Sequence, residues 1–441
     1  MLQNYGLFSL KGHAARLGGG EKDFSMLFAY AAIDYYLKED EKLGFLITQE
    51  VYKSKGAGEG FRRFRLGDKE YFKVLKAHDL VTVQPFEKAA NKTAMIILKK
   101  GIATTYPVPY TLWKRKKGVG RIPTDSSLKD ALTLLQKQKL LAQPIGSVTG
   151  PWQTISEKQK GLKTIEGENA YKARRGASTE PYGVFWLEVK EVLSDGNLIV
   201  RNQAKRGKRT IPQFEESVEP DLVYPLVSGA DIERWGAEPK DYILMPQDPQ
   251  EREPYSESQL KKNLPRTYGY LTKFKNMLLS RGSKTVRELS ERTAFYAMYG
   301  IGSYTVARYK VVWKRMANDI IASVISQYKT PFGYKMVIPS DTTAIFSLDD
   351  ENEAHYLCAI INSAPVREFV KTYSSAGRGF GAPSVMEHIA IPKFDPKNKL
   401  HQKLAHLSKI LHDYKQKDNP DKVESEKEVD SLVRELFGIS A

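Results

Sequence analysis

Lysine and arginine are the residues of this sequence whose number and spacing most clearly indicate a chemical role. The chain of 441 residues holds 68 Lys and Arg against 52 Asp and Glu, a formal net charge of +16. Eleven of these cations lie in the three short runs "KRKK" (114–117), "KARR" (172–175) and "KRGKR" (205–209). A basic surface attracts polyanions, and each phosphate that it neutralises adds salt-dependent affinity. The pattern favours nucleic-acid binding over a merely well-solvated basic surface. The predicted phosphate contacts are Arg174, Arg175, Lys205, Arg206, Lys208 and Arg209.

A second group of candidates lies where basic and aromatic residues alternate, in "RTAFYAMYGIGSYTVARYKVVWKR" (292–315). Such side chains reach base edges and phosphates. In the loop "SSAGRGFGAPS" (374–384) an arginine stands between glycines, which allow a backbone to approach DNA closely. A solvated strand face and an ordinary flexible loop are the alternatives, and both remain open. The candidate DNA contacts in these segments are Arg292, Tyr304, Arg308, Lys310, Arg315 and Arg378.

Phosphate binding by a glycine-rich loop is less favoured. The glycines Gly18–Gly20 lead into an amphipathic run, but "GGGEKDFS" lacks the spacing of a P-loop. A dinucleotide-binding loop must follow a strand, and residues 1–17 show no convincing one. We therefore interpret the glycines as a turn into a helix.

Metal, disulfide and membrane chemistry are also disfavoured. The single cysteine excludes a disulfide framework and a multi-cysteine zinc site, and the seven histidines form no H-E-x-x-H arrangement. His355 and His388 are expected to be structural, and no metal site is predicted. The sequence has no run of about 18 apolar residues and no signal pattern, so we expect a soluble, cytoplasmic protein without membrane partners.

The elements of the first hundred residues alternate between helix and strand. Apolar spacing predicts a helix over 23–38, and a short apolar run predicts a buried strand over 42–48. "GEGFRRFRL" (58–66) indicates a helix start, and strands are predicted over 78–86 and 92–100. This order is typical of the end of a doubly wound α/β sheet that closes in a hairpin. Because a parallel sheet must be covered on both faces, these residues look like the second half of a domain.

Further along the chain the patterns are mixed. "SLKDALTLLQKQKLL" (127–141) indicates a helix, and "GVFWLEVKEVL" and "GNLIVRNQ" indicate a strand pair around the turn "SDG". Short β-like segments fill residues 225–398. The tail 399–438 is strongly helical and closes on a glycine.

The order of these segments resembles the gamma class of adenine-specific DNA methyltransferases, in particular the large restriction–modification (type IIG-like) enzymes. "KDFSMLFAYAAIDYYL" and "EKLGFLITQEVYKS" are similar to a helix and strand of that catalytic domain, and "VQPFEKAANKTAMIILKKG" to its closing hairpin. "VYPLVSGADIERWGAEPKDYILMP" (224–246) resembles the entry to the target-recognition domain. "AHYLCAIINSAPVREFV" and "GAPSVMEHIAIPKFDP" resemble its end.

The resemblance implies an α/β protein with four parts. It implies the C-terminal half of a methyltransferase catalytic domain over 1–101, a partial class I, Rossmann-like sheet. A basic connector over 102–223, a mixed α+β target-recognition domain over 224–398 and a helical tail over 399–441 follow.

The chain departs from the family at the motifs that carry the chemistry. It has no F-x-G-x-G after a strand and no Asn-Pro-Pro-aromatic sequence, so no catalytic residue is predicted in it. The resemblance implies a site-specific adenine-N6 methyltransferase of a restriction–modification or phage-defence system. In that case S-adenosyl-L-methionine (AdoMet) and double-stranded DNA would be bound, and methyl transfer would need no metal. We expect the chain alone to be inactive, with a separate chain supplying the N-terminal methyltransferase half and a restriction nuclease as a further partner.

By the same resemblance, Asp23 and Phe28 correspond to the cofactor end of the catalytic domain. A plain helix cap and a core aromatic are their respective alternatives. Phe86 corresponds to the loop aromatic that stacks on a flipped adenine, an interaction of about 1–3 kcal/mol, and Lys88 and Asn91 lie beside it.

Other functions remain open. The chain could be a stand-alone DNA-specificity subunit without enzymatic activity, although the apolar segment 23–98 would then lack a partner sheet. A nuclease has only family association in its favour, because no P-D-x(n)-(D/E)-x-K pattern stands out. A remnant of a broken gene is the remaining alternative.

Overall fold

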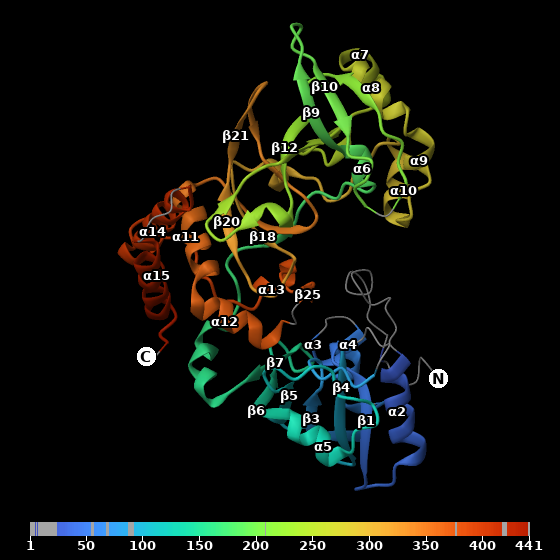
Figure 1. Cartoon of the computed structure of the whole chain (residues 1–441), viewed down its shortest axis with the longest axis vertical. Coiled ribbons are helices and arrows are strands. Elements are labelled where there is room, and N and C mark those ends of the chain that lie inside the picture. The colour runs from blue at the N-terminus through green and yellow to red at the C-terminus, as the bar shows by residue number, and fades with distance from the viewer. Residues whose placement is uncertain are drawn as a thin grey trace. The chain divides into compact units, whose positions relative to one another are not determined.

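The chain folds into two compact units, each with its own core. The computed structural model describes residues 5, 7, 24–53, 57–67, 70–86, 92–207, 209–374, 377–416 and 421–439. Unit 1 is Met1–Glu166 with Phe369–Ser375, and unit 2 is Gly167–Glu368 with Ala376–Ala441 (Figure 1). The chain is therefore mixed α/β with several sheets, as the sequence predicts. Residues 102–223, expected to be a connector, are divided between the two units.

Unit 1 is built on one seven-stranded sheet of order β1-β4-β3-β5-β6-β7, with β2 paired to β3. Its strands are β1 (Lys42–Thr48), β2 (Arg65–Leu66), β3 (Glu70–Asp79), β4 (Thr93–Lys100), β5 (Val108–Arg115), β6 (Leu135–Pro144) and β7 (Trp152–Ile155). Its helices are α2 (Phe24–Tyr36), α3 (Glu50–Lys53), α4 (Ala57–Phe61), α5 (Leu128–Leu134) and the 3-10 helix η1 (Glu157–Ile165).

The hairpin expected at the end of the first hundred residues is present. Strand β4 lies between β1 and β3 and is antiparallel to both, so β1 and β3 are parallel to each other. The prediction of a strand over 78–86 is wrong, because β3 occupies Glu70–Asp79. Beyond it the chain turns: the amide of Val83 donates to the carbonyl of Leu80, and Gln84 has a φ of 50°.

Strands β5, β6 and β7 extend this sheet in a way that the sequence did not predict. The helix expected over 127–141 is wrong beyond Leu134, where β6 begins. Helix α5 buries none of its residues, whereas β6 pairs with β5 over the whole of Val108–Arg115. Cross-strand pairing therefore outweighs local helix propensity here.

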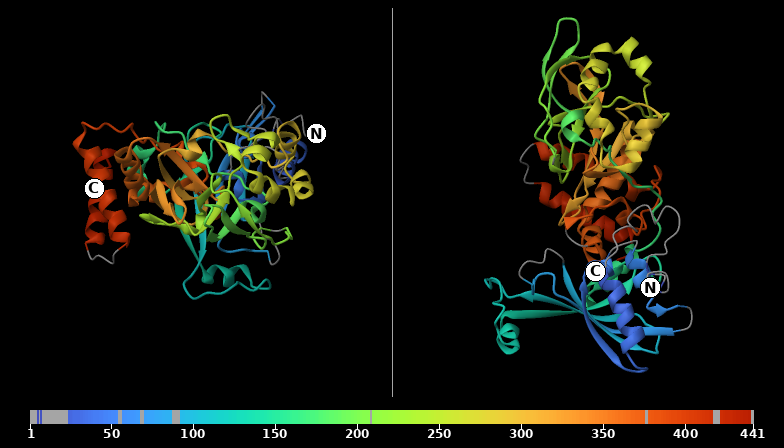
Figure 2. Two further views of the ribbon diagram at one scale, coloured as in Figure 1. Left: turned by 90° about the horizontal axis from the view of Figure 1, so that it is seen from above. Right: turned by 90° about the vertical axis from the view of Figure 1, so that its right-hand side faces the viewer.

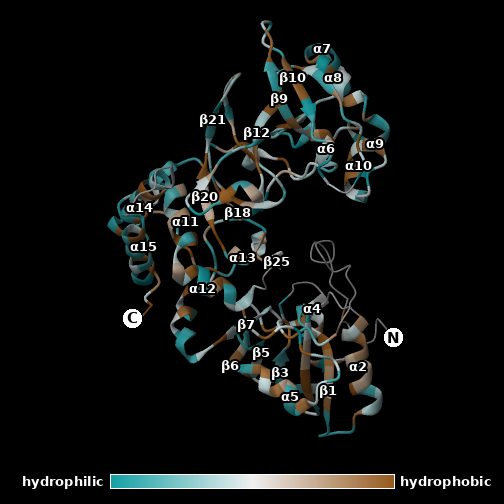
Figure 3. Ribbon diagram, in the orientation of Figure 1, coloured by the Kyte–Doolittle hydropathy of each residue, from teal (hydrophilic) through white to brown (hydrophobic). Residues whose placement is uncertain are grey.

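Aromatic side chains dominate the core of unit 1. The ring of Tyr30 packs edge-on against Phe72 at 4.9 Å, and its hydroxyl donates to the carbonyl of Phe61 at 2.7 Å. Trp152 of β7 stacks on Tyr52 at 4.7 Å. In Figure 3 the strand β1 carries hydrophobic colours along much of its length. This core joins the first and last strands of the unit.

A buried lysine fixes the separate segment Phe369–Ser375 in unit 1. The ammonium group of Lys53 donates to the carbonyl of Trp152 at 2.9 Å and to that of Thr372 at 2.7 Å. It also donates to the hydroxyl of Thr154 at 3.1 Å. Burial lowers the pKa of Lys53 to about 7.

Unit 2 contains two main sheets. The six-stranded sheet has the order β11-β10-β9-β15-β12-β23, and the four-stranded sheet has the order β20-β18-β24-β8. The first is made of β9 (Trp186–Val192), β10 (Leu198–Asn202), β11 (Glu215–Val218), β12 (Val223–Val227), β15 (Asp241–Leu244) and β23 (Ile338–Pro339). The second is made of β8 (Arg174–Arg175), β18 (Tyr309–Lys314), β20 (Ala322–Ile325) and β24 (Thr343–Leu348).

Smaller strand pairs complete the β-structure of unit 2. They are β13 (Ile232–Glu233) with β14 (Gly236–Ala237), β16 (Gln247–Asp248) with β17 (Glu253–Pro254), β19 (Met316–Ala317) with β25 (Gly377–Arg378), and β21 (Gln327–Thr330) with β22 (Gly333–Met336). The strand pair predicted around "SDG" is confirmed as β9 and β10.

The helices of unit 2 cover these sheets and form the C-terminal tail (Figure 2). They are α6 (Tyr182–Phe185), α7 (Glu257–Asn263), α8 (Pro265–Thr272), α9 (Lys275–Leu279), α10 (Lys284–Arg292), α11 (Glu351–Asn362), α12 (Ala364–Tyr373, shared with unit 1), α13 (Pro383–Met386), α14 (Lys399–Gln416) and α15 (Lys422–Leu436), with the 3-10 helices η2 (Gly229–Asp231) and η3 (Ser303–Val306). The helical tail is confirmed as α14 and α15.

Two buried residues show how these helices are held. Arg281, two residues after α9, donates to the carbonyls of Leu278, Phe295 and Ala297. His355 of α11 lies 3.0 Å from the hydroxyl of Ser408 of α14, which agrees with a structural role. Burial lowers the pKa of His355 to about 3.

No helix within the described part of the chain is long and apolar enough to cross a membrane. Among those same described ranges, no group of three His, Cys, Asp or Glu side chains could hold a metal ion.

Candidate nucleic-acid interface

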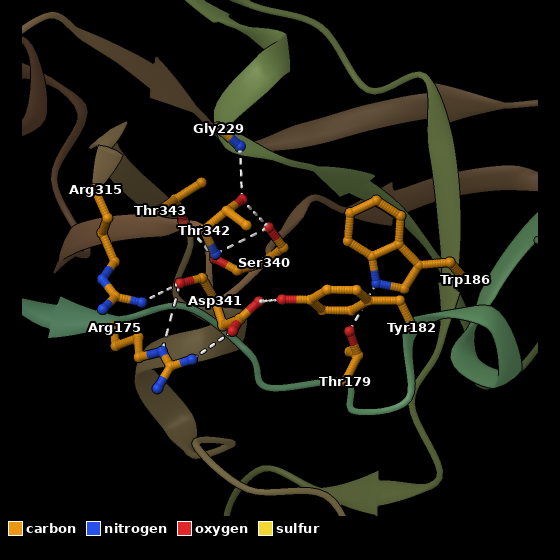
Figure 4. Close-up of polar contacts among 10 residues, drawn as sticks. All are labelled: Arg175, Thr179, Tyr182, Trp186, Gly229, Arg315, Ser340, Asp341, Thr342 and Thr343. Carbon is orange, nitrogen blue, oxygen red and sulfur yellow. Dashed lines mark hydrogen bonds and ion pairs between the residues drawn. The ribbon is translucent and has the colours of Figure 1, made fainter. Parts of the chain in front are cut away.

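The loop Ser340–Thr342 connects the two main sheets of unit 2 and is the centre of the candidate site. Strand β23 ends before it and pairs in parallel with β12, while β24 begins after it. The hydroxyls of Ser340 and Thr342 lie 2.7 Å apart, and the amide of Gly229 donates to Thr342 at 2.8 Å (Figure 4). These bonds fix the loop and therefore the side chain of Asp341 between them.

Asp341 gathers two of the predicted DNA-binding arginines. Its carboxylate forms an ion pair with Arg175 of β8 and accepts a hydrogen bond of 2.8 Å from the hydroxyl of Tyr182. Its backbone carbonyl accepts hydrogen bonds from Arg315 and Arg175 (Figure 4). The Asp341 side chain is 10% exposed, whereas that of Arg175 is 46% exposed. Both guanidinium groups are thus anchored at one point while Arg175 still faces solvent.

The close approach of β8 to this loop depends on Gly176. A Cβ atom at that position would lie 2.1 Å from the carbonyl oxygen of Ser340, so a larger residue would force the two segments apart. The next residue, Ala177, donates its amide to the carbonyl of Pro339 at 2.8 Å. The glycine after the run "KARR" is therefore required for the position of Arg175.

An aromatic pair links this centre to the second basic run. The ring of Tyr182 packs against Trp186 at 5.2 Å, and the indole nitrogen of Trp186 donates to Thr179 at 2.7 Å (Figure 4). The guanidinium group of Arg206 lies 4.9 Å above the Trp186 ring. Burial, followed by the charge of Asp341, raises the pKa of Tyr182, so its hydroxyl keeps its proton and remains a donor. Side-chain contacts therefore connect Arg175 of the run "KARR" with Arg206 of the run "KRGKR".

A shallow pocket of about 630 Å³ opens beside Arg206. The charged residues of its lining are Arg201, Lys205, Arg206 and Lys240 with the two carboxylates Glu188 and Asp241. Asp241 holds the guanidinium group of Arg206 at 3.0 Å. The lining therefore has a net positive charge, although Arg206 is already paired with Asp241.

Arg174 faces a different environment from that of its neighbour Arg175. It is exposed, and its guanidinium group lies 5.4 Å above the ring of Tyr304 in η3. Arg308, also exposed, lies in the same way 5.4 Å above the ring of Tyr309. Stacking of this kind orients a guanidinium group without neutralising it.

Arg315 and the glycine loop of Arg378 come together, although 63 positions separate them in the sequence. Strand β19 pairs with β25, which places the backbone of Arg378 opposite Met316. The carbonyl of Arg315 accepts a hydrogen bond of 3.1 Å from the amide of Gly381. The side chain of Arg378 lies outside the described residues.

Three other predicted contacts have different positions. Lys310 is fully buried and donates to the carbonyl of Ala307 at 2.7 Å, so its prediction as a DNA contact is corrected to a core position. Its strand β18 lies between β20 and β24 and is buried on both faces. Arg292 is exposed and lies 3.6 Å from Glu253, and Arg209 is half-buried. The predicted contact Lys208 lies outside the described residues.

The candidates of unit 1 are only partly described. Phe86 is 49% exposed in the connection between β3 and β4, which suits an aromatic that stacks on a base. Phe28 is 64% exposed on α2, so it is not a core aromatic. Asp23, Lys88 and Asn91 lie outside the described residues.

Sequence reasoning missed Asp341, Tyr182 and Trp186, which connect the predicted arginines. A signal for the first was present: "PSDTT" (339–343) is a polar run between two apolar strands. Trp186 lies in a predicted strand and Tyr182 just before it, with no sign in the sequence that a basic run stacks on them.

Neither a protein-family model nor a curated protein matches the sequence. Solved structures do match. The fold is similar to that of the type IIL restriction-modification enzyme MmeI, solved in complex with DNA, with a TM-score of 0.56 and 10% identity. This match covers 99% of the present chain and 52% of the MmeI chain, so the chain spans about half the length of that enzyme.

Two further matches have lower TM-scores. The type IIG restriction endonuclease BpuSI has a TM-score of 0.31 at 13% identity, over 95% of this chain and 49% of that one. The type ISP restriction-modification enzyme LlaBIII, bound to DNA, has a TM-score of 0.37 at 11% identity, over 87% and 26%. The similarity to restriction-modification enzymes that the sequence indicated is thus confirmed for the fold, on the MmeI match.

Proposed function

We propose that unit 2 binds double-stranded DNA through the surface that surrounds Asp341. The observation that carries this proposal is an unbroken series of side-chain contacts that joins two separate basic runs. It leads from Arg175 through Asp341, Tyr182 and Trp186 to Arg206. Arginine held in a fixed orientation suits base edges, and exposed cations beside it suit phosphates. The similarity of fold to an enzyme solved with DNA supports the same function.

We further propose that the chain is the C-terminal part of an AdoMet-dependent adenine-N6 DNA methyltransferase of a restriction–modification or phage-defence system, acting in the cytoplasm. The arrangement of β1, β4 and β3, with an antiparallel strand between two parallel ones, supports a partial class I sheet. Phe86 lies in the connection after β3, where a base-stacking aromatic is expected.

The described residues of unit 1 do not fit AdoMet by themselves. Phe28, the cofactor candidate that is described, stands on an exposed helix face beside Phe24 and Tyr35. Apolar rings alone cannot satisfy the charged groups of AdoMet. Methyl transfer is therefore proposed only with the complementing N-terminal half.

A labelled random-sequence duplex tests the DNA-binding proposal directly. We expect the purified chain to bind it with an affinity that falls steeply as salt rises. Incubation with radiolabelled AdoMet tests the enzymatic proposal: DNA should stay unlabelled with this chain alone and become labelled when a chain carrying the AdoMet and Asn-Pro-Pro-aromatic motifs is added. Labelling by the chain alone would show that the divided-enzyme proposal is wrong.

One observation favours a second function, that of a stand-alone DNA-specificity subunit. The sequence suggested that unit 1 would lack a partner sheet, but β5, β6 and β7 enlarge its sheet and core. A specificity subunit would bind DNA equally well and would stay without methyl transfer after complementation. The labelling experiment therefore separates the two functions.

A further inference from the structure

The hairpin of β21 and β22 in unit 2 has one packed face and one open face. Its register pairs Gln327 with Met336 and Lys329 with Tyr334. Residues directly opposite each other share a face, and the two faces alternate along each strand. These four side chains therefore lie on the same face of the hairpin. The hairpin is a separate two-stranded sheet, and Figure 1 shows it extending away from β20.

The opposite face fixes the hairpin to the rest of unit 2. The ammonium group of Lys335 donates to the carbonyl of Pro220 at 2.8 Å and to that of Asp221 at 3.2 Å. The ring of Phe332, in the turn, packs against Tyr242 of β15 at 5.6 Å. The hairpin is thereby held in a defined position, so a partner that binds its open face has little backbone freedom to remove.

The open face carries donors, an acceptor and an aromatic ring that are free to contact a partner. Tyr334 is 69% exposed, and Gln327 and Lys329 are also exposed. Among the described residues, these three side chains have no hydrogen bond, ion pair or ring contact. The open face thus has polar groups that a partner can use without breaking an internal pair.

Charge and position favour DNA as the partner of this face. Residues 325–340 contain Lys329 and Lys335 and no Asp or Glu. The segment continues through β23 into Asp341, the centre of the candidate interface. Tyr334 and Asp341 are seven positions apart, so their Cα atoms lie within about 25 Å of each other. One turn of B-DNA is about 34 Å long, so a single duplex can contact both places.

The dimensions of the hairpin fit the major groove. This groove is about 12 Å wide and admits a two-stranded ribbon, whereas the minor groove is only about 6 Å wide. Gln327 and Lys329 are two positions apart on β21, a distance of about 6.6 Å, which is close to two base-pair steps of about 3.4 Å. In the major groove, glutamine pairs with the N6 and N7 atoms of adenine, and lysine donates to the O6 and N7 atoms of guanine.

We propose that the open face of the β21–β22 hairpin lies in the major groove of a DNA duplex and reads base edges there. Gln327 and Lys329 form the hydrogen bonds with the bases, and the ring of Tyr334 packs beside them. This inference rests on the proposed binding of DNA by unit 2, and it adds a second place at which the sequence of the duplex is read. The basic residues around Asp341 contact the same duplex.

Selection from a pool of random-sequence duplexes tests whether the hairpin determines sequence preference. The parent chain and the variants Gln327→Ala and Tyr334→Ala are incubated with the pool, and the bound duplexes are sequenced. Both positions are exposed and neither substitution changes the net charge, so circular dichroism and the urea midpoint should be unchanged. We expect Gln327→Ala to lose the preference of the parent at one base pair and Tyr334→Ala at a neighbouring one. Tyr71→Ala, at an exposed aromatic of β3 in unit 1, is the control and should enrich the parent sequence.

Modified bases in the enriched duplex identify the groove. A 7-deazapurine removes the N7 acceptor from the major groove, inosine in place of guanine removes the amino group from the minor groove, and neither changes a phosphate. We expect a 7-deazapurine at the position read by Gln327 to weaken binding of the parent at least fivefold, about the lower limit for one bidentate base contact. Gln327→Ala should not respond to that 7-deazapurine, and its affinity for random-sequence duplex should stay within twofold of the parent. Inosine should affect parent and variant equally.

The possible results separate this inference from the proposed function. If the parent chain bound no duplex, DNA binding by unit 2 would be wrong and the inference with it. Duplex binding without an enriched sequence would overturn only the reading of bases by the hairpin. The same holds for a sequence preference that both hairpin variants retain, and for equal 7-deazapurine effects in the parent and in Gln327→Ala.

Discussion

Arg174 and Arg175 are adjacent on β8, yet the structure predicts different effects when each is replaced by glutamine. The guanidinium group of Arg174 lies over the ring of Tyr304 and is exposed, so it is available to a phosphate. That of Arg175 is paired with the carboxylate of Asp341. Removal of Arg174 takes a cation from the interface. Removal of Arg175 breaks an internal pair and leaves the Asp341 carboxylate, 10% exposed, with its hydrogen bond from Tyr182.

Counterion release gives the size of the first effect. Each phosphate contact contributes about 0.9 to the slope of log K against log salt, so Arg174→Gln should lower the slope by about 0.9. Referred to 1 M salt, this is about eightfold in affinity at 0.1 M, or about 1.2 kcal/mol. Arg175→Gln should change the slope by less than about 0.3 and should lower the free energy of unfolding by about 1 kcal/mol, because its side chain is 46% exposed.

Fluorescence anisotropy of a labelled duplex, titrated at several salt concentrations, measures both slopes. Urea denaturation of the same variants measures stability. Arg308→Gln is the matched comparison, because Arg308 also lies over a tyrosine ring and should behave like Arg174. The reasoning is refuted if Arg174→Gln leaves the slope unchanged, or if Arg175→Gln lowers it as much as Arg174→Gln does.

Three further predictions concern buried groups. Burial lowers the pKa of His355 from 6.5 to about 3, so the contribution of this residue to the free energy of unfolding is fully present above pH 6.5. Below pH 6.5 the free energy of unfolding should fall by about 1.4 kcal/mol per pH unit as the pH drops toward 3, because only the unfolded chain binds the proton. Equal urea midpoints at about pH 7 and about pH 5 would contradict this prediction. Arg281→Met removes the donor of a buried network and should cost about 3–5 kcal/mol by thermal denaturation, whereas Lys284→Met, at an exposed position, should cost nothing measurable. Burial lowers the pKa of Lys310 from 10.5 to about 7, so the free energy of unfolding should rise as pH increases from about 7 to 10.5, where only the unfolded chain keeps the proton. Lys310→Met should abolish that rise and leave DNA affinity unchanged, because Lys310 is fully buried. A weaker DNA affinity of this variant would show that Lys310 does contact DNA.

Elements with strong local patterns could be predicted from the sequence. Helix α2, strand β1, the β9–β10 pair and the C-terminal helices lie where apolar spacing indicated them. Strand β6 could not be predicted, because its sequence is that of a helix and only the long antiparallel pairing with β5 makes it a strand. The failure at Lys310 has a similar cause. Basic and aromatic residues in this segment suggest an exposed strand face, but β18 is buried at four successive positions, and α11, β13 and η2 contact it.

The arginine-rich runs were visible in the sequence, but their connection was not. Arg175 and Asp341 are 166 positions apart, and their contact depends on the pairing of β8 with β24. A single carboxylate in a polar loop carries no sign that an arginine from another strand will reach it. Composition thus predicted binding to a polyanion. The tertiary fold determines which cations are held by a carboxylate and which are free of such a pair.

The distinction between held and free cations bears on how unit 2 could select a DNA sequence. Arg175 is fixed by Asp341, and Arg206 by Asp241 and by the ring of Trp186, so each guanidinium group already has a defined orientation. An oriented guanidinium loses little entropy when it meets a base edge, but its paired carboxylate reduces the electrostatic attraction to phosphate. Arg174 has the opposite properties: its charge attracts any phosphate group, and it does not distinguish between DNA sequences. We therefore expect substitutions at the held arginines to alter sequence preference, and substitutions at the free ones to weaken binding to all duplexes equally.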